Sequence, residues 1–171
     1  MLQEYLLLSC SNRDDKMIKP LIRLATAKDA SLICDFNIAM AYETEQTRLD
    51  ANVTLAGVNG LMRHPDRGFY VVAEVQDRVV ASLMVTKEWS DWRDSFFWWI
   101  QSVYVTPEFR RQGIYSAMYK FVQKMAKAEP DVFGFRLYVE RDNLPAQKTY
   151  EKLGMTETHY KMYEQLKENN G

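Results

Sequence analysis

The sequence predicts a single α/β domain in which helices flank a mixed β-sheet. Its 171 residues suit one domain and are enough to bury a hydrophobic core. In the middle of the chain, three segments rich in β-branched and aromatic residues follow one another with polar turns between them. After them, segments with helical spacing alternate with β-forming ones, which is typical of parallel strands joined by helices. We therefore expect an antiparallel front half that meets parallel strands.

The first part of the chain predicts one strand and two helices. Residues 22–25 form a short strand, and Thr26 and Asp29 are spaced to cap the helix that follows it. Imperfect helical spacing of apolar residues carries this helix to about Tyr42. A second helix is predicted over residues 53–62.

The remaining elements are marked by turn residues and by changes in the spacing of apolar residues. The clearest helix begins after Gly113, where apolar residues recur at helical spacing, and it must end before Pro130. Gly154 closes a later helix, and residues 88–94 form a polar and aromatic turn. The predicted strands are residues 69–75, 79–86, 96–105, 134–139 and 158–166, and the predicted helices are residues 114–125 and 145–153.

Composition excludes several classes of protein. A net charge of −1 argues against a general binder of nucleic acid or anionic membranes. No apolar run approaches the roughly 18 residues of a membrane span, and the N-terminal run does not resemble a secretory signal. We expect a cytoplasmic protein with a disordered tail over residues 1–16 and one domain over residues 17–171. Cys10 and Cys34 have no metal-binding spacing, so we expect reduced thiols and no metal.

The segment from Val103 to Ser116 is the strongest candidate for chemistry. It combines the end of a strand, a turn with Arg110 and Arg111, and the start of a long helix. A helix N-terminus presents unpaired N–H groups and a partial positive charge, and Gly113 lets the backbone approach a ligand closely. These features suit a phosphate group, although the segment matches neither a Walker P-loop nor a GxGxxG motif. The alternative is a simple strand-to-helix turn with solvent-facing arginines.

Two motifs together resemble the GCN5-related N-acetyltransferases, the GNAT family. The sequence Arg-Arg-Gln-Gly-Ile-Tyr from Arg110 to Tyr115 is similar to the pyrophosphate loop of that family. The block from Asn143 to Met155 is similar to the family's Asn-x-x-Ala-x-x-x-Tyr-x-x-x-Gly pattern. The resemblance covers roughly residues 22–166. It implies the acyl-CoA N-acyltransferase fold, acetyl-CoA as co-substrate, and an N-acetyltransferase domain over residues 17–171.

The resemblance also implies roles for individual residues. Backbone groups at Val103 and Val105 would pair with the pantetheine arm, and the N–H groups of residues 111–116 would hold the pyrophosphate. Asn143 would bind pantetheine or cap the following helix, and Tyr150 would act as general acid or pack in the core. The implied cofactor-binding residues are Val103, Val105, Arg110, Arg111, Gln112, Gly113, Ile114, Tyr115, Ser116 and Asn143, and the implied catalytic residue is Tyr150.

The chain departs from the family pattern at two positions. Gln101 stands on the strand where the family often has a carboxylate that acts as general base, and an amide cannot take that proton. The base is therefore unassigned. The second departure is Tyr115, which replaces the usual small residue of the loop and would crowd it unless its ring points away from the phosphates. By residue type alone, the candidate bases are Glu43, Glu45, Glu74 and Glu88.

The acceptor is predicted to be the primary amine of a small molecule. The segment from Tyr42 to Glu45 lies where the family shapes its acceptor site, and acids beside aromatic rings suit a cationic amine. Four tryptophans could line that site, or could lie in the core or in the interface of a homodimer: Trp89, Trp92, Trp98 and Trp99. The alternatives are a protein N-terminal or lysine acetyltransferase, and a non-catalytic acyl-CoA-binding sensor.

Overall fold

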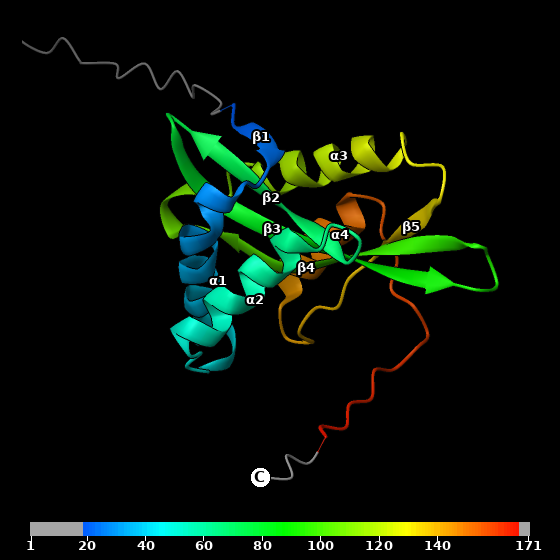
Figure 1. The fold of residues 1–171 in the computed structure, drawn as a ribbon. Helices are drawn as coiled ribbons and strands as arrows, with labels where there is room; N and C mark the ends of the chain where they lie inside the picture. Colours follow the sequence, from blue (N-terminus) through cyan, green and yellow to red (C-terminus); the bar gives the residue numbers. More distant parts are fainter. Residues whose placement is uncertain (1–18, 168–171) are drawn as a thin grey trace, which may run out of the picture. The chain divides into compact units, whose positions relative to one another are not determined.

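The computed structural model describes residues 19–167, so the predicted tail and Cys10 lie outside the described residues. The chain forms two compact units, one ending at Arg136 and the other beginning at Leu137. The first unit is built on a five-stranded sheet in the order β1-β2-β3-β4-β5 (Figure 1). The strands are β1 Leu21–Leu24, β2 Gly68–Val75, β3 Arg78–Ser90, β4 Ser95–Val105 and β5 Val132–Arg136.

The sheet is mixed, as the sequence predicts. Strands β1 to β4 pair antiparallel with their neighbours, and β5 pairs parallel with β4. The connection between β4 and β5 carries the helix α3 (Ile114–Ala126), because two parallel neighbours cannot be joined by a tight hairpin. The expected meeting of an antiparallel half with a parallel strand is therefore confirmed.

Helices cover both faces of this sheet. The helices α1 (Ala30–Glu45) and α2 (Ala51–Arg63) pack on one face, where Ile33 and Val58 contact Val72 in one cluster. Helix α3 packs on the other face, where Met118 lies in a second cluster with Val71. The neighbours Val71 and Val72 point to opposite faces, so β2 is apolar from Phe69 to Ala73 because both of its sides are buried there.

The turn between β3 and β4 is shorter than predicted. Pairing continues to Ser90 opposite Ser95, so residues 88–90 belong to β3 and only residues 91–94 form the turn. An edge-on contact between Trp89 and Phe96, with ring centroids 5.0 Å apart, extends the cross-strand packing into this hairpin.

The second unit contains the helix α4 (Leu144–Lys152), followed by Gly154 at a φ of 89°. This agrees with the predicted helix and its glycine cap. The predicted strand over residues 158–166 is wrong, because this segment has no regular structure. Its alternating residues Tyr160 and Met162 are exposed, and the described part of this unit offers no strand whose backbone could pair with them.

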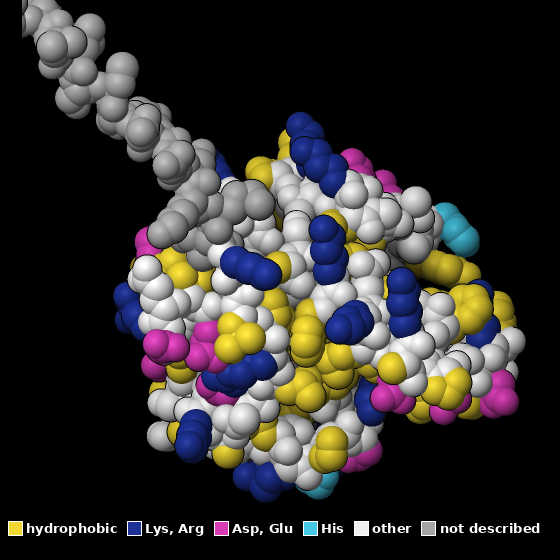
Figure 2. All heavy atoms as spheres, turned by 90° about the horizontal axis from the view of Figure 1, so that it is seen from above, with side chains coloured by type: hydrophobic (Ala, Val, Ile, Leu, Met, Phe, Trp, Pro, Cys, Tyr) yellow, Lys and Arg dark blue, Asp and Glu magenta, His cyan; other side chains and the backbone are white. Residues whose placement is uncertain are grey.

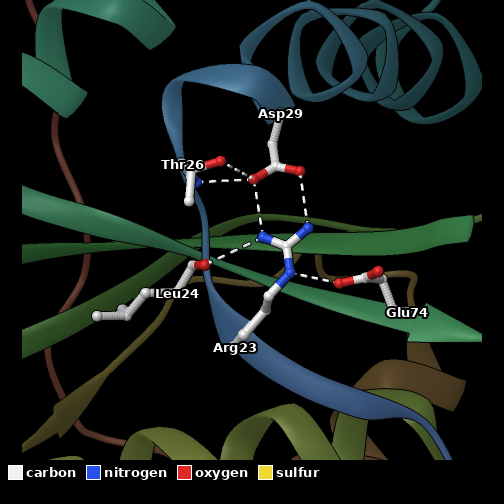
Figure 3. Close-up of polar contacts among 5 residues, drawn as sticks. All are labelled: Arg23, Leu24, Thr26, Asp29 and Glu74. Atoms are coloured by element: carbon white, nitrogen blue, oxygen red, sulfur yellow. Dashed lines mark hydrogen bonds and ion pairs between the residues drawn. The ribbon is translucent and has the colours of Figure 1, made fainter. Parts of the chain in front are cut away.

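A polar network fixes the start of α1 to the edge of the sheet (Figure 3). Arg23 on β1 donates to both carboxylate oxygens of Asp29, at 2.8 and 2.9 Å, and its Nε donates to Glu74 on β2. The Thr26 N–H donates to Asp29 at 2.7 Å, which is the capping contact that the sequence predicts. Hydrogen bonds from Arg23 hold the pKa of the Asp29 carboxyl at about 2, below its ordinary 3.8.

We predict that Asp29→Asn destabilises the fold by about 2 kcal/mol near neutral pH. Because the folded state lowers the pKa of Asp29, its ionised form stabilises the protein above about pH 4, and this contribution is lost as the pH falls towards 2. Denaturant unfolding of both proteins across this range should therefore show a difference that shrinks in acid. Asp35→Asn, on the exposed side of α1, is the control and should change little. A difference that does not depend on pH would contradict this assignment.

Candidate active site

The outer edge of β4 is open along its second half. Pairing with β5 runs from Phe96 opposite Val132 to Trp99 opposite Arg136, and no strand among residues 19–136 pairs with this edge beyond that point. The Thr106 N–H donates to β3 at 2.9 Å. Since successive backbone groups alternate in direction, those of Val103 and Val105 face the open edge. This edge can accept an extended ligand as an added strand does.

A β-bulge shapes the same half of β4. Leu83 on β3 lies opposite both Ser102 and Val103, and Ser102 has a φ of 48°, in the left-handed region. Val103 consequently packs on the core cluster under α3, while Tyr104 faces α1 and contacts the Phe36 ring at 5.2 Å. The sequence contains no glycine here to signal a bulge, so sequence reasoning missed it.

The turn after β4 leads into the N-terminus of α3 as the sequence predicts. Gly113 is the N-cap with a φ of 77°, and no side chain caps the first turn. Arg111 also adopts a positive φ, of 61°. A Cβ on Gly113 would meet nothing within 4 Å, so the backbone conformation, not crowding, favours glycine there. The uncapped N–H groups and the helix dipole together form a site suited to an anion.

The structure directs Arg110 towards α1. Its Nη2 donates to Glu43 at 2.6 Å, and its Nε donates to the Val105 carbonyl at 2.8 Å. The Tyr104 hydroxyl donates to the same Glu43 carboxylate at 3.1 Å. Burial, and then the hydrogen bond to Glu43, raise the pKa of Tyr104. Glu43 and Arg110 are far apart in the chain, and no local pattern predicts their contact.

The other side chains of the loop serve the fold. Gln112 donates to the Glu108 carbonyl at 2.9 Å, and Ile114 is buried in the core. The Tyr115 ring stacks on Tyr119, one helical turn further along, with centroids 6.2 Å apart. The Tyr115 ring, which would crowd the loop unless it pointed away from the phosphates, thus packs along α3. At these positions the backbone, and not the side chain, is available to a ligand.

In the second unit, Asn143 is the N-cap of α4 and Tyr150 lies within this helix. The Asn143 side-chain oxygen accepts from the Ala146 N–H at 3.2 Å and so caps this helix. Tyr150 is half-buried, and its burial raises the pKa of the phenol. A phenol of raised pKa stays protonated at neutral pH and can donate a hydrogen bond.

Most of the candidate bases form ion pairs with arginine side chains. Gln101 donates to the Thr86 hydroxyl. Three of the four carboxylates proposed by residue type form ion pairs with arginine: Glu43 with Arg110, Glu74 with Arg23, and Glu88 with Arg136. The oxygens of these three carboxylates are therefore engaged with guanidinium groups.

The tryptophans do not gather around one site. Trp98 is only 3% exposed and packs in the core on the α3 side. Trp99 donates instead to Glu88 on β3. Trp89, near the end of β3, is 51% exposed, and Trp92, in the β3–β4 turn, is 84% exposed. Of the alternatives that the sequence leaves open, Trp98 takes the core, and alternation along β4 separates it from Trp99.

A pocket of about 430 Å³ lies between α1, α2 and the sheet. Asn37 of α1 lines it and is 9% exposed, and its Oδ1 has no hydrogen-bond partner among the described residues. Ser102, at the bulge, also lines the pocket, which therefore reaches the open half of β4. The remaining lining residues are Thr54, Gly57, Val58, Gly60, Leu61, Arg67, Tyr70 and Met84.

Three further observations bear on partners. Lys and Arg side chains are scattered among uncharged groups on the face seen in Figure 2, with no single basic patch. Over residues 19–167, no group of three or more His, Cys, Asp or Glu side chains could hold a metal ion. None of the helices in the described chain combines the length and apolar character that crossing a bilayer requires.

We predict that Glu43→Gln lowers the pKa of Tyr104, because both the accepting carboxylate and its charge raise that pKa. Titration of ¹³C-labelled tyrosine rings by NMR would measure the change. Glu45→Gln, two residues along the same exposed helix end, is the control and should leave the pKa of Tyr104 as it is. An unchanged Tyr104 titration in Glu43→Gln would contradict the contact.

Comparisons with known proteins identify the family and the fold. The model of the acetyltransferase (GNAT) family matches residues 31–155. A possible acetyltransferase from Clostridium difficile 630 is 44% identical, with a TM-score of 0.80 over 86% of this chain and 97% of that one. An aminoglycoside N-acetyltransferase in complex with CoA shares the fold at 14% identity and a TM-score of 0.69, over 86% of this chain and 95% of that one. Curated protein sequences give no significant match. With most of its length matched by the family model, the chain belongs to the acetyltransferase (GNAT) family.

Proposed function

We propose that the protein transfers acetyl from acetyl-CoA to the primary amine of a small molecule. The observation that carries the proposal is the open half of β4, which leads directly into the uncapped N-terminus of α3. The extended pantetheine arm of acetyl-CoA can pair with the strand edge, and its pyrophosphate can bind at the helix end. Membership of the acetyltransferase family supports an acyl-CoA-dependent enzyme.

The residues present fit the co-substrate mainly through their backbone. Val103 offers its N–H and carbonyl to the pantetheine arm, while the Val105 carbonyl already accepts from Arg110. The N–H groups from Arg111 to Ser116 would hold the pyrophosphate, with Arg111 adding charge. Arg110 contributes by fixing the end of β4, since its guanidinium is paired with Glu43. We further propose that Asn143, whose side-chain oxygen caps α4, donates to pantetheine through its Nδ2.

The chemistry requires a neutral amine and a proton for the leaving group. Acetyl-CoA supplies an activated thioester. The amine nitrogen attacks its carbonyl carbon, the C–S bond breaks, and the overall exchange converts an ammonium and the thioester into an amide, a thiol and one proton. An alkylamine of pKa about 10.4 is neutral in only about one molecule in 2,500 at pH 7, which costs about 4.6 kcal/mol. Because Gln101 cannot act as a base, we assign none.

Tyr150 is the proposed general acid for the departing thiolate. For ordinary pKa values of about 10 and 8.5, this proton transfer is uphill by roughly 2 kcal/mol. Burial raises the pKa of Tyr150 and so makes the complete transfer more uphill. The proposed role is therefore hydrogen-bond donation to sulfur as the C–S bond breaks, a role that a protonated phenol can fill across the neutral range.

The small-molecule acceptor is favoured over a protein by the size of the pocket between α1, α2 and the sheet. Its volume of about 430 Å³ is within the range of small-ligand sites. The aminoglycoside acetyltransferase of similar fold supports the same class of acceptor. A non-catalytic acyl-CoA-binding sensor is the second candidate, and the amide at Gln101 in place of a carboxylate favours it.

Calorimetry with acetyl-CoA, followed by a thiol-release assay over a panel of amines, tests the proposal. We expect binding at tens of micromolar or tighter, and thiol release with at least one small amine. Absence of acetyl-CoA binding would exclude the proposed function. Tight binding without turnover of any amine would favour the sensor.

We predict that Tyr150→Phe lowers kcat by about tenfold or more while the Kd for acetyl-CoA stays within about twofold. The phenylalanine keeps the ring in place and removes only the hydroxyl. Tyr163→Phe, at an exposed position of the same unit, is the control and should change neither constant. Equal losses in kcat and in affinity would count against a role as acid.

A further inference from the structure

The pocket beneath α1 and α2 contains a buried acceptor atom without a donor. Asn37 is nine-tenths buried, and its Oδ1 has no partner within residues 19–167. The same side chain lies beside the Tyr70 phenol, where it partly offsets the rise in pKa that burial causes. A buried carbonyl oxygen left unpaired is costly, so a ligand that brings an N–H or O–H donor would gain affinity here.

Two glycines leave space in the wall of this pocket. Gly57 and Gly60 lie inside α2, where glycine is a poorer helix former than alanine. Neither adopts a positive φ, and a Cβ at either position would meet nothing within 4 Å. Neither the backbone conformation nor close packing therefore requires glycine at these positions. The space that they leave opens into the pocket they line.

The charge of the lining differs from what a simple cationic amine requires. Arg67 is the charged residue among those that line the pocket, and no carboxylate of the described chain lines it. Arg67 is exposed and forms no ion pair with a described carboxylate. A guanidinium in this setting is complementary to a carboxylate, which it can bind in bidentate fashion.

We infer that this pocket binds an acceptor that carries its own carboxylate, of the amino-acid class, with the carboxylate at Arg67 and an N–H donor directed to Asn37. This inference rests on the proposed acetyltransferase function, because it names the acceptor of that reaction. Apolar Val58, Leu61 and Met84 leave the rest of the pocket to an aliphatic side chain. The lining residue Ser102 connects the pocket to β4, next to Val103 on the open edge.

The test uses three ligands with one carbon skeleton: leucine, leucinamide and isoamylamine. NMR shift titrations of the full chain measure binding without acetyl-CoA. We expect leucine to bind at least about tenfold more tightly than the two ligands without a carboxylate. Arg67→Gln should abolish this preference, whereas Arg63→Gln, an exposed α2 residue outside the pocket, should retain it. Equal binding of all three ligands, a preference that survives Arg67→Gln, or no leucine binding at millimolar concentration would overturn the inference.

Filling the space left by α2 provides a second test. Gly60→Ala should raise Tm by a few degrees, because alanine favours the helix, and should weaken leucine binding by at least about threefold. Val53→Ala, an exposed position of the same helix, should leave leucine binding unchanged. Since a variant that gains stability cannot lose binding by unfolding, undiminished leucine affinity in Gly60→Ala would place leucine elsewhere.

These outcomes separate the inference from the function on which it rests. The titrations need no turnover, so they decide the ligand class even when thiol release is absent with every amine. Conversely, thiol release that is equally fast with leucine and isoamylamine and does not respond to Arg67→Gln would preserve the acetyltransferase and remove the carboxylate preference.

Discussion

The ion pair between Arg23 and Asp29 fixes the element on which most of the candidate site depends. Arg23 reaches from β1 to Asp29 at the start of α1 and to Glu74 on β2, so the first turn of the helix is tied to two strands. Helix α1 then extends over the sheet and carries Asn37 in its middle and Glu43 near its end. The placement of one helix therefore determines both a wall of the pocket and the partner of Arg110.

Helix α1 also links the two sides of the proposed reaction. Asn37 faces the pocket assigned to the acceptor, and Glu43 binds Arg110 at the start of the loop assigned to the phosphates. Because Glu43 neutralises Arg110, the positive potential of that loop comes from Arg111 and from the N-terminus of α3. The loop thus holds its ligand mainly through backbone N–H groups, whose positions depend on the folded chain and not on flexible side chains.

The sequence predicted the mixed sheet, helix α3 and the location of the glycine turn, because each follows from local spacing of apolar residues or from one turn residue. It did not predict the partner of Arg110 or the bulge at Ser102, since both arise from contacts between distant segments. The segment 158–166 failed as a strand for a related reason. Alternating side chains can give a segment one apolar face, but the segment forms a strand only when a neighbouring strand supplies the backbone hydrogen bonds.

The bulge at Ser102 has a consequence for how the chain tolerates insertions and deletions. Two residues of β4 share one position opposite β3, so the side chains on either side of Ser102 follow different alternations. Deleting Ser102 would leave Val103 alone opposite Leu83 and Tyr104 opposite Ser82, so the ladder would become regular and neither side chain would change face. A deletion elsewhere in β4 would instead invert the side chains between that position and the bulge. A single lost codon is therefore better tolerated at Ser102 than in the regular part of the strand.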